Sequence, residues 1–161
     1  MTDPAREVAE RLDTLYRAID ARAMRGLPIH NPCLEVQTVG FRPYRGWALG
    51  ALVTPWFMNL VLAAIPAGPP LPAAGPGESH TLDLPVGSLE FVVGDVEGFG
   101  RLDSLSLFSP MASFDDPAVT RVTAAAAVTA LFEPVPSGTA ATLAAPRNRR
   151  DLLFGRGAAA S

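Results

Sequence analysis

The sequence predicts an α+β fold: a mostly antiparallel sheet of about five strands, with an N-terminal and a C-terminal helix packed on it. Two Asp-Pro pairs, Asp3-Pro4 and Asp116-Pro117, predict where the helices begin. In each pair the Asp side chain can cap the helix, and the proline suits the first helical turn. The strand-like segments between them follow one another without regular strand–helix alternation. We expect both helices on one face of the sheet, a single domain over 1–136, and a flexible tail over 137–161.

The first helix is indicated by an apolar stripe at helical spacing. Val8, Leu12, Leu15 and Ile19 recur every three or four residues, and Gly26 is a natural stop after them. The second helix is Ala-rich. We expect it from about 118 to 132, because Pro134 cannot continue it.

The strands are indicated by apolar runs and by alternation. The segment 47–54 is apolar at nearly every position, which is typical of a strand covered on both faces. Leu89, Phe91 and Val93 alternate with other residues, and a Gly-Phe-Gly turn at 98–100 joins them to a second alternating run. The expected strands are 34–41, 47–54, 57–62, 89–93 and a last one around 104–107. The segment 81–84 is a candidate short strand, and a helical turn is the alternative at 57–62. The Pro- and Gly-rich segment 66–77 is predicted as a surface loop.

Composition excludes several classes of protein. Hydrophobic residues make up 48% of the 161 residues and charged residues 18%, so a real core is expected. The formal net charge of -3 is unlike that of a nucleic-acid-binding domain. The single cysteine, Cys33, excludes an internal disulfide and a cysteine cage for a metal. The first residues do not resemble a secretory signal, so a cytoplasmic protein is expected. We also expect no metal and no cofactor.

Catalytic motifs are missing from the sequence. His30 and His80 have no partner at metal-ligand spacing, and we expect both in solvent-exposed loops. The segment 94–100, GDVEGFG, lacks the glycine spacing and the following helix of a nucleotide-binding loop. Neither Ser106 nor Ser109 has a histidine nearby in the sequence. We therefore expect a binding protein rather than an enzyme.

The most informative segment is the charge-free run at 47–65, WALGALVTPWFMNLVLAAI. Its length is close to that of a membrane span, but Gly50, Thr54, Pro55 and Asn59 interrupt it. Proline has no N–H for a sheet ladder, so Pro55 belongs at an edge or a bulge. We therefore expect no stable membrane span. We interpret the run as a pair of strands, and we expect the edge of this pair to present large apolar side chains to a partner.

Two apolar clusters beside prolines form the predicted partner-binding site. Trp56, Phe57 and Met58 follow Pro55, and a second cluster ends the last strand. Aromatic and Met side chains are common anchors of protein interfaces. We hypothesise that the two strand ends lie side by side and form one accessible patch. The complete set of predicted binding residues is Trp47, Pro55, Trp56, Phe57, Met58, Asn59, Phe108, Pro110 and Met111.

A second candidate lies in the tail. Arg149-Arg150 followed by Leu152-Leu153 imitates a twin-arginine export signature, but no long apolar region follows it. We interpret this segment as a mimic that occupies a signal-recognising site, on this chain or on a partner. The alternative interpretation is an ordinary basic tail.

Three segments together resemble a known family. They are NPCLEVQTVGFRPYRGWALGALVTPWFMNLVL at 31–62, LDSLSLFSPMASFDD at 102–116 and RNRRDLLFGR at 147–156. The combination resembles the [NiFe]-hydrogenase assembly chaperones of the HybE/HupJ type. Some members of that family carry a fused rubredoxin with two cysteine pairs, which a sequence with Cys33 alone does not contain.

The resemblance implies a maturation chaperone that proofreads hydrogenase assembly before export. Its implied partners are the small subunit precursor, which bears a twin-arginine signal, alone or in its complex with the large subunit, and other maturation factors. Two other readings of the residues stay open. One is a carrier of a small molecule or peptide with an apolar pocket between sheet and helices. The other is a peripheral membrane protein anchored by 47–65.

Overall fold

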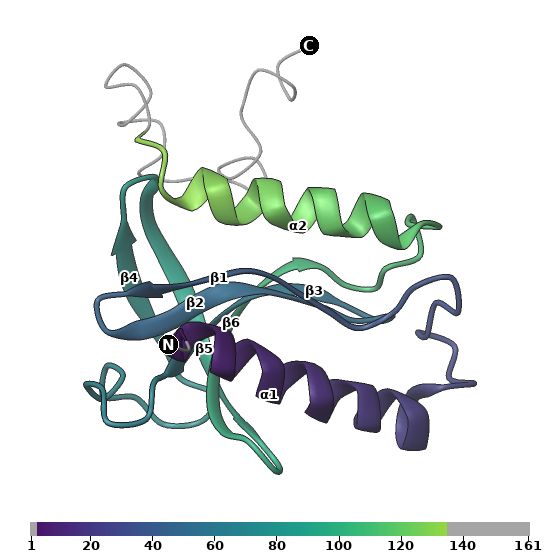
Figure 1. The fold of residues 1–161 in the computed structure, drawn as a ribbon, viewed down its shortest axis with the longest axis horizontal. Helices are drawn as coiled ribbons and strands as arrows, with labels where there is room; N and C mark the ends of the chain where they lie inside the picture. The colour runs from purple at the N-terminus through teal and green to yellow at the C-terminus, as the bar shows by residue number, and fades with distance from the viewer. Residues whose placement is uncertain (1–2, 135–161) are drawn as a thin grey trace.

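The structure, a computed structural model, describes residues 3–134, which form a six-stranded sheet with a helix on each face (Figure 1). The predicted α+β class is confirmed. The tail predicted at 137–161 lies outside the described residues. The elements in chain order are α1 (Pro4–Ile19), a π-helical turn η1 (Asp20–Met24), β1 (Gln37–Tyr44), β2 (Trp47–Val53), β3 (Met58–Ala64), β4 (Ser79–Leu84), β5 (Gly87–Val96), β6 (Gly100–Phe108) and α2 (Pro117–Leu131).

The sheet consists of two antiparallel meanders joined at its centre. The strand order is β1-β2-β3-β6-β5-β4, and all five neighbouring pairs are antiparallel. The segment 65–78 carries the chain from central β3 out to the edge at β4, and β6 then returns to pair with β3. Consequently the first residue of β3 meets the last residue of β6, with Met58 opposite Phe108.

The two helices cover opposite faces of the sheet, so the expectation that they share one face was wrong (Figure 1). The reason lies in β2, where every residue after Trp47 is buried. A strand that is apolar on both faces needs a layer on each side. Leu49 of β2 packs in the cluster beneath α2, whereas Leu52 packs in the separate cluster beneath α1.

The helix α1 begins as its sequence predicts, but of the predicted stripe only Val8 and Leu12 are buried, while Leu15 and Ile19 are partly buried. The Asp3 carboxylate accepts a hydrogen bond from the Ala5 N–H at 2.9 Å, which satisfies one of the free donors of the first turn. Val8 and Leu12 are fully buried against the sheet. Beyond Ile19 the backbone widens into η1, and such π-helical turns are frequent at functional sites.

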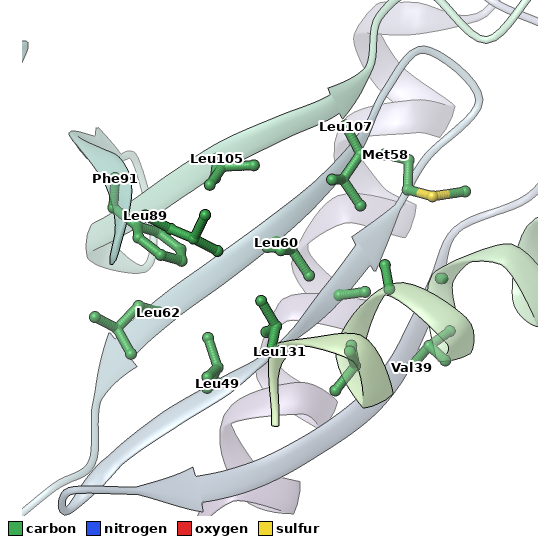
Figure 2. Close-up of a cluster of buried hydrophobic side chains, with 14 of the residues drawn as sticks. Val39, Leu49, Met58, Leu60, Leu62, Leu89, Phe91, Leu105, Leu107 and Leu131 are labelled. Carbon is green, nitrogen blue, oxygen red and sulfur yellow. The ribbon is translucent and has the colours of Figure 1, made fainter. Parts of the chain in front are cut away.

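The larger core lies between α2 and the other sheet face (Figure 2). Leu131 of α2 packs among leucines of the central strands, including Leu49 and Leu60, and Phe91 extends the same cluster toward the β4 edge. Fully burying a side chain of this size contributes roughly 1.5–3 kcal/mol to stability. This cluster therefore fixes the position of α2 over the sheet.

The edge strand β1 differs from its predicted bounds. It begins at Gln37 rather than at 34 and continues to Tyr44, beyond the expected end at 41. The turn is the short Arg45-Gly46 step, where both residues have positive φ. Gly40, at φ 68°, lies where the register with β2 shifts between Val39 and Arg42, so a glycine bulge lets β1 continue past this point.

Candidate partner-binding surface

Pro55 lies in a tight turn between β2 and β3, not in a bulge within a strand. The Thr54 N–H donates to the Phe57 carbonyl at 2.8 Å, and the Thr54 hydroxyl accepts hydrogen bonds from the N–H groups of Trp56 and Phe57. Proline suits the first central position of such a turn because its φ is already set. The turn therefore presents Trp56 and Phe57 at one end of the sheet, which we call the loop end.

Asn31 ties three loops together at the loop end. Its N–H donates to the Pro55 carbonyl at 2.9 Å, which links residues 28–33 to the β2–β3 turn. Its side-chain NH₂ group donates to the carbonyls of Met111 at 3.0 Å and Phe114 at 2.6 Å. Its side-chain oxygen accepts from the Cys33 N–H at 3.0 Å. One asparagine thus holds segments that lie about eighty residues apart in the chain.

Trp56 and Phe57 form an aromatic group on the α1 face. The ring of Tyr16 lies 6.4 Å from that of Trp56 and 5.9 Å from that of Phe57, and Trp56 contacts Phe57 edge-on at 5.8 Å. Both side chains are partly buried. Burial raises the pKa of the Tyr16 hydroxyl above its ordinary value of 10.0. The group is a half-exposed aromatic corner that α1 supports from behind.

His30 is held between this corner and η1, so the expectation of an exposed loop histidine was wrong. Its ring stacks on Trp56 at 6.5 Å, and its Nε2 lies 2.7 Å from a carboxylate oxygen of Asp20, itself 8% exposed. Arg25 approaches the other oxygen of that carboxylate at 3.8 Å. Asp20 in η1 and His30 in the following loop lie ten residues apart in the sequence, so a search for a partner at helical spacing could not identify the pair.

Each predicted cluster is divided between core and surface. Met58 and Met111 are both 0% exposed, so their predicted accessibility was wrong. Met58 is the first residue of β3, and its side chain points into the core beneath α2 (Figure 2). Phe108 stays partly buried and meets Phe114 edge-on at 5.1 Å, while Pro110 is exposed after a cis peptide bond.

The two clusters do meet at one end of the sheet, but they do not form one continuous patch. Trp56 and Phe57 pack against the α1 cluster, whereas Phe108 packs against the α2 cluster. Strand ends that are neighbours in the ladder can still present side chains to opposite faces. The segment 28–33 lies between the two groups, because Asn31 bonds to both loops.

The other predicted residues are scattered. Trp47 starts β2, at the opposite end from Trp56, and its indole N–H donates to the Pro70 carbonyl at 3.2 Å. Pro55 is buried within its turn, and Asn59 is partly buried on β3. Arg149, Arg150, Leu152 and Leu153 lie outside the described residues.

An open pocket of about 440 Å³ lies between the loops that Asn31 joins. All residues from 28 to 33 line one wall, and Pro110, Ala112, Phe114 and Asp115 line the other. Ile29 in the first wall is 49% exposed. A second pocket, of about 570 Å³, opens on the other side of His30 toward Arg17, Arg25 and Glu35. The lining of the first pocket is mainly apolar with one carboxylate, which suits an apolar peptide that carries positive charge.

The far end of the sheet is closed by a buried charged network. Asp103, which is 0% exposed, accepts two hydrogen bonds from the Arg101 guanidinium at 2.9 and 3.0 Å and lies 2.6 Å from Nε2 of His80. Arg101 also donates to the Pro72 carbonyl at 2.8 Å, which fastens the loop after β3. His80 was expected in an exposed loop, but its side chain is only 9% exposed and its ring stacks on Phe91 of β5.

The described residues lack both a metal site and a membrane-spanning helix. Between residues 3 and 134, no cluster of three or more His, Cys, Asp or Glu side chains has the arrangement needed to hold a metal ion. In the same part of the chain, no helix combines the length and apolar character that crossing a membrane requires.

Sequence reasoning missed Asn31, Tyr16 and the Asp20–His30 pair. The Asn31-Pro32 dipeptide was a usable signal, because asparagine before proline favours a turn in which the side chain bonds to backbone groups. The widening of α1 into η1 had no comparable signal.

Comparison with known proteins identifies relatives across nearly the whole chain. A family model described as "[NiFe]-hydrogenase assembly, chaperone, HybE" matches residues 7–155. The hydrogenase expression/formation protein HupJ of Bradyrhizobium diazoefficiens is 42% identical over 144 residues, which cover 87% of this chain and 83% of HupJ. The hydrogenase expression/formation protein HupT of Azotobacter chroococcum is 44% identical over 71% of this chain and 75% of HupT.

A solved structure supports the same relationship. The solution structure of HybE from Escherichia coli superposes with a TM-score of 0.58 at 25% identity, covering 76% of this chain and 73% of HybE. The resemblance that the sequence indicated is therefore confirmed, as is the predicted fold class.

Proposed function

Because the chain belongs to the HybE family of [NiFe]-hydrogenase assembly chaperones, we propose that it binds the precursor of a hydrogenase small subunit before export. Binding is non-catalytic and takes place in the cytoplasm. It holds the small subunit, alone or in its complex with the large subunit, until assembly is complete. Family membership carries the chaperone role, and the choice of client rests on the chemistry of the loop end.

The observation that carries this choice is the pocket between residues 28–33 and 110–115. It joins exposed Ile29 and Pro110 to the carboxylate of Asp115. A twin-arginine signal segment combines positive charge with apolar side chains, so both halves of such a segment have a counterpart here. The half-exposed rings of Trp56 and Phe57 supply a second apolar contact next to the same loops. Aromatic anchors of this kind contribute disproportionately to protein interfaces.

The binding residues predicted from sequence are retained here only where they are accessible. Trp56, Phe57, Phe108 and Pro110 belong to the proposed surface. Met58 and Met111 act from beneath it, as core residues that fix the two loops in place.

Calorimetry with purified proteins tests the proposal. The chain is titrated with the small subunit precursor, with the same subunit lacking its signal, and with the large subunit precursor. An unrelated twin-arginine precursor serves as the control. We expect the small subunit precursor to bind most tightly. Equal binding of the unrelated precursor, or no binding of any hydrogenase subunit, would overturn the proposal.

A further inference from the structure

The outward face of α2 is apolar and nearly uncharged. Val122 is 69% exposed and Val119 is 49% exposed. Ala118, Ala125, Ala126 and Thr129 are exposed beside them, and the only charge in the helix is that of Arg121. A helix that shows such a face to water is normally covered by another segment.

This face adjoins the pocket at the loop end. Phe114 and Asp115 line the pocket, and α2 follows them at once, with Asp116 as its N-cap. Asp116 is occupied, because its carboxylate accepts from the Ala118 N–H at 2.9 Å. Asp115 is exposed, and in the part of the chain that the structure describes it makes no ion pair. An acidic group therefore stands at the junction of two apolar surfaces.

The charge of the chain is divided between its two parts. Four of the 13 arginines and one of the 16 acidic residues lie within 147–156, so that segment carries +3 while the residues before it carry -6. The segment also contains Leu152, Leu153 and Phe154. A basic and apolar segment is thus joined to an acidic body with an uncovered apolar face.

The connecting length permits contact within one molecule. The helix α2 has 15 residues and is about 22 Å long. The residues between Pro134 and Arg149 can span up to about 45 Å when extended. The segment can therefore reach the N-terminal end of α2 from its C-terminal end.

We propose that residues 147–156 dock on the chain's own loop-end surface. Arg149 and Arg150 pair with Asp115, and Leu152, Leu153 and Phe154 cover Val119 and Val122. Asp115 also lines the pocket proposed for the signal segment of a client, so the docked segment is a competitor that the client displaces. The competition, although not the docking, rests on the proposed function.

Paramagnetic relaxation in the full chain tests the docking without any client. Cys33→Ser removes the native thiol, and Gly157→Cys allows a nitroxide label beside the segment. We expect strong broadening of the amide signals of Asp115, Val119 and Val122, with Val92 of β5 unaffected as an equally apolar, exposed reference. Broadening that is weak and uniform over the domain would overturn the proposal. Broadening only between separately labelled copies would also overturn it, because it would assign the contact to a second molecule.

A charge exchange separates docking from a non-specific effect. Asp115→Arg should abolish the broadening, and Arg149→Glu with Arg150→Glu should restore it in the same molecule. Asp116 stays unchanged because it caps α2. Loss without restoration would contradict the assigned ion pairs.

The competition has its own readout. Removal of residues 147–161 should tighten binding of a synthetic client signal peptide by about tenfold, the factor expected when the segment occupies its site nine-tenths of the time. Docking without any peptide binding would leave the inference standing and remove the proposed function. Unchanged affinity in a molecule whose segment docks would overturn the competition.

Discussion

The two ends of the sheet each hold a His–Asp pair, but the two ends are built in opposite ways. At the far end, Asp103 is fully buried and bonded to both Arg101 and His80. At the loop end, Asp20 and His30 line open pockets. The loops there are held by hydrogen bonds from the Asn31 side chain to backbone carbonyls. We infer that the far end contributes mainly to stability, whereas the loop end arranges the proposed binding surface. Each end should therefore respond differently to substitution.

The largest effect is expected at the closed end. Asp103→Ala leaves Arg101 and His80 without their buried partner, and such a loss typically costs about 3–5 kcal/mol. We expect a marked fall in the urea midpoint, with client affinity unchanged for the molecules that stay folded. Asp95→Ala, in the same hairpin but exposed, should leave the midpoint nearly unchanged. Equal midpoints for the two variants would remove the distinction between the ends.

The next effect concerns Asn31. Asn31→Asp keeps the acceptor for Cys33 but removes both donations to the carbonyls of Met111 and Phe114. We expect a loss of about 1–3 kcal/mol of stability, because two carbonyls lose their partners. Hydrogen exchange should show the loosening at 28–33 and 110–115 rather than at β4 and β5. Uniform loosening would mean that Asn31 supports the whole fold.

A third test probes packing between the ends. A Cβ added to Gly50 would lie 2.4 Å from the ring of Phe41, so Gly50→Ala forces that ring to move. Overpacking of this kind costs roughly 1–3 kcal/mol. Gly50→Ala combined with Phe41→Leu should recover part of the loss in thermal denaturation. A lack of recovery would place the strain elsewhere.

The smallest effect is a dependence on alkaline pH at the loop end. The folded state raises the pKa of Tyr16, so the unfolded state releases that proton first as the pH rises. The stabilising contribution is complete below pH 10 and is lost as the pH rises toward the folded pKa. Tyr16→Phe should flatten the decline above pH 10 in denaturant titrations. An identical decline in both proteins would exclude Tyr16 as its source.

The fold could be predicted further than the surface. Asp3-Pro4 and Asp116-Pro117 marked both helices because capping is a local property, and both prolines stand at the first helical position. Met58 and Met111 are buried because both side chains pack into the core beneath α2. A neighbouring proline in the sequence does not show in which direction a side chain points. Asn31 and the two His–Asp pairs join residues from different loops and strands, so no local spacing marked them.

The most direct test of the central claim compares two exposed β-branched residues. Ile29 lines the loop-end pocket and is 49% exposed, whereas Val92 lies on β5 and is 43% exposed. Ile29→Glu and Val92→Glu are measured for affinity toward the small subunit precursor, at equal thermal stability. We predict that Ile29→Glu weakens binding at least tenfold, about 1.4 kcal/mol, while Val92→Glu leaves it unchanged. Equal effects of the two substitutions, or a loss with Val92→Glu alone, would contradict the assignment of client binding to the loop end.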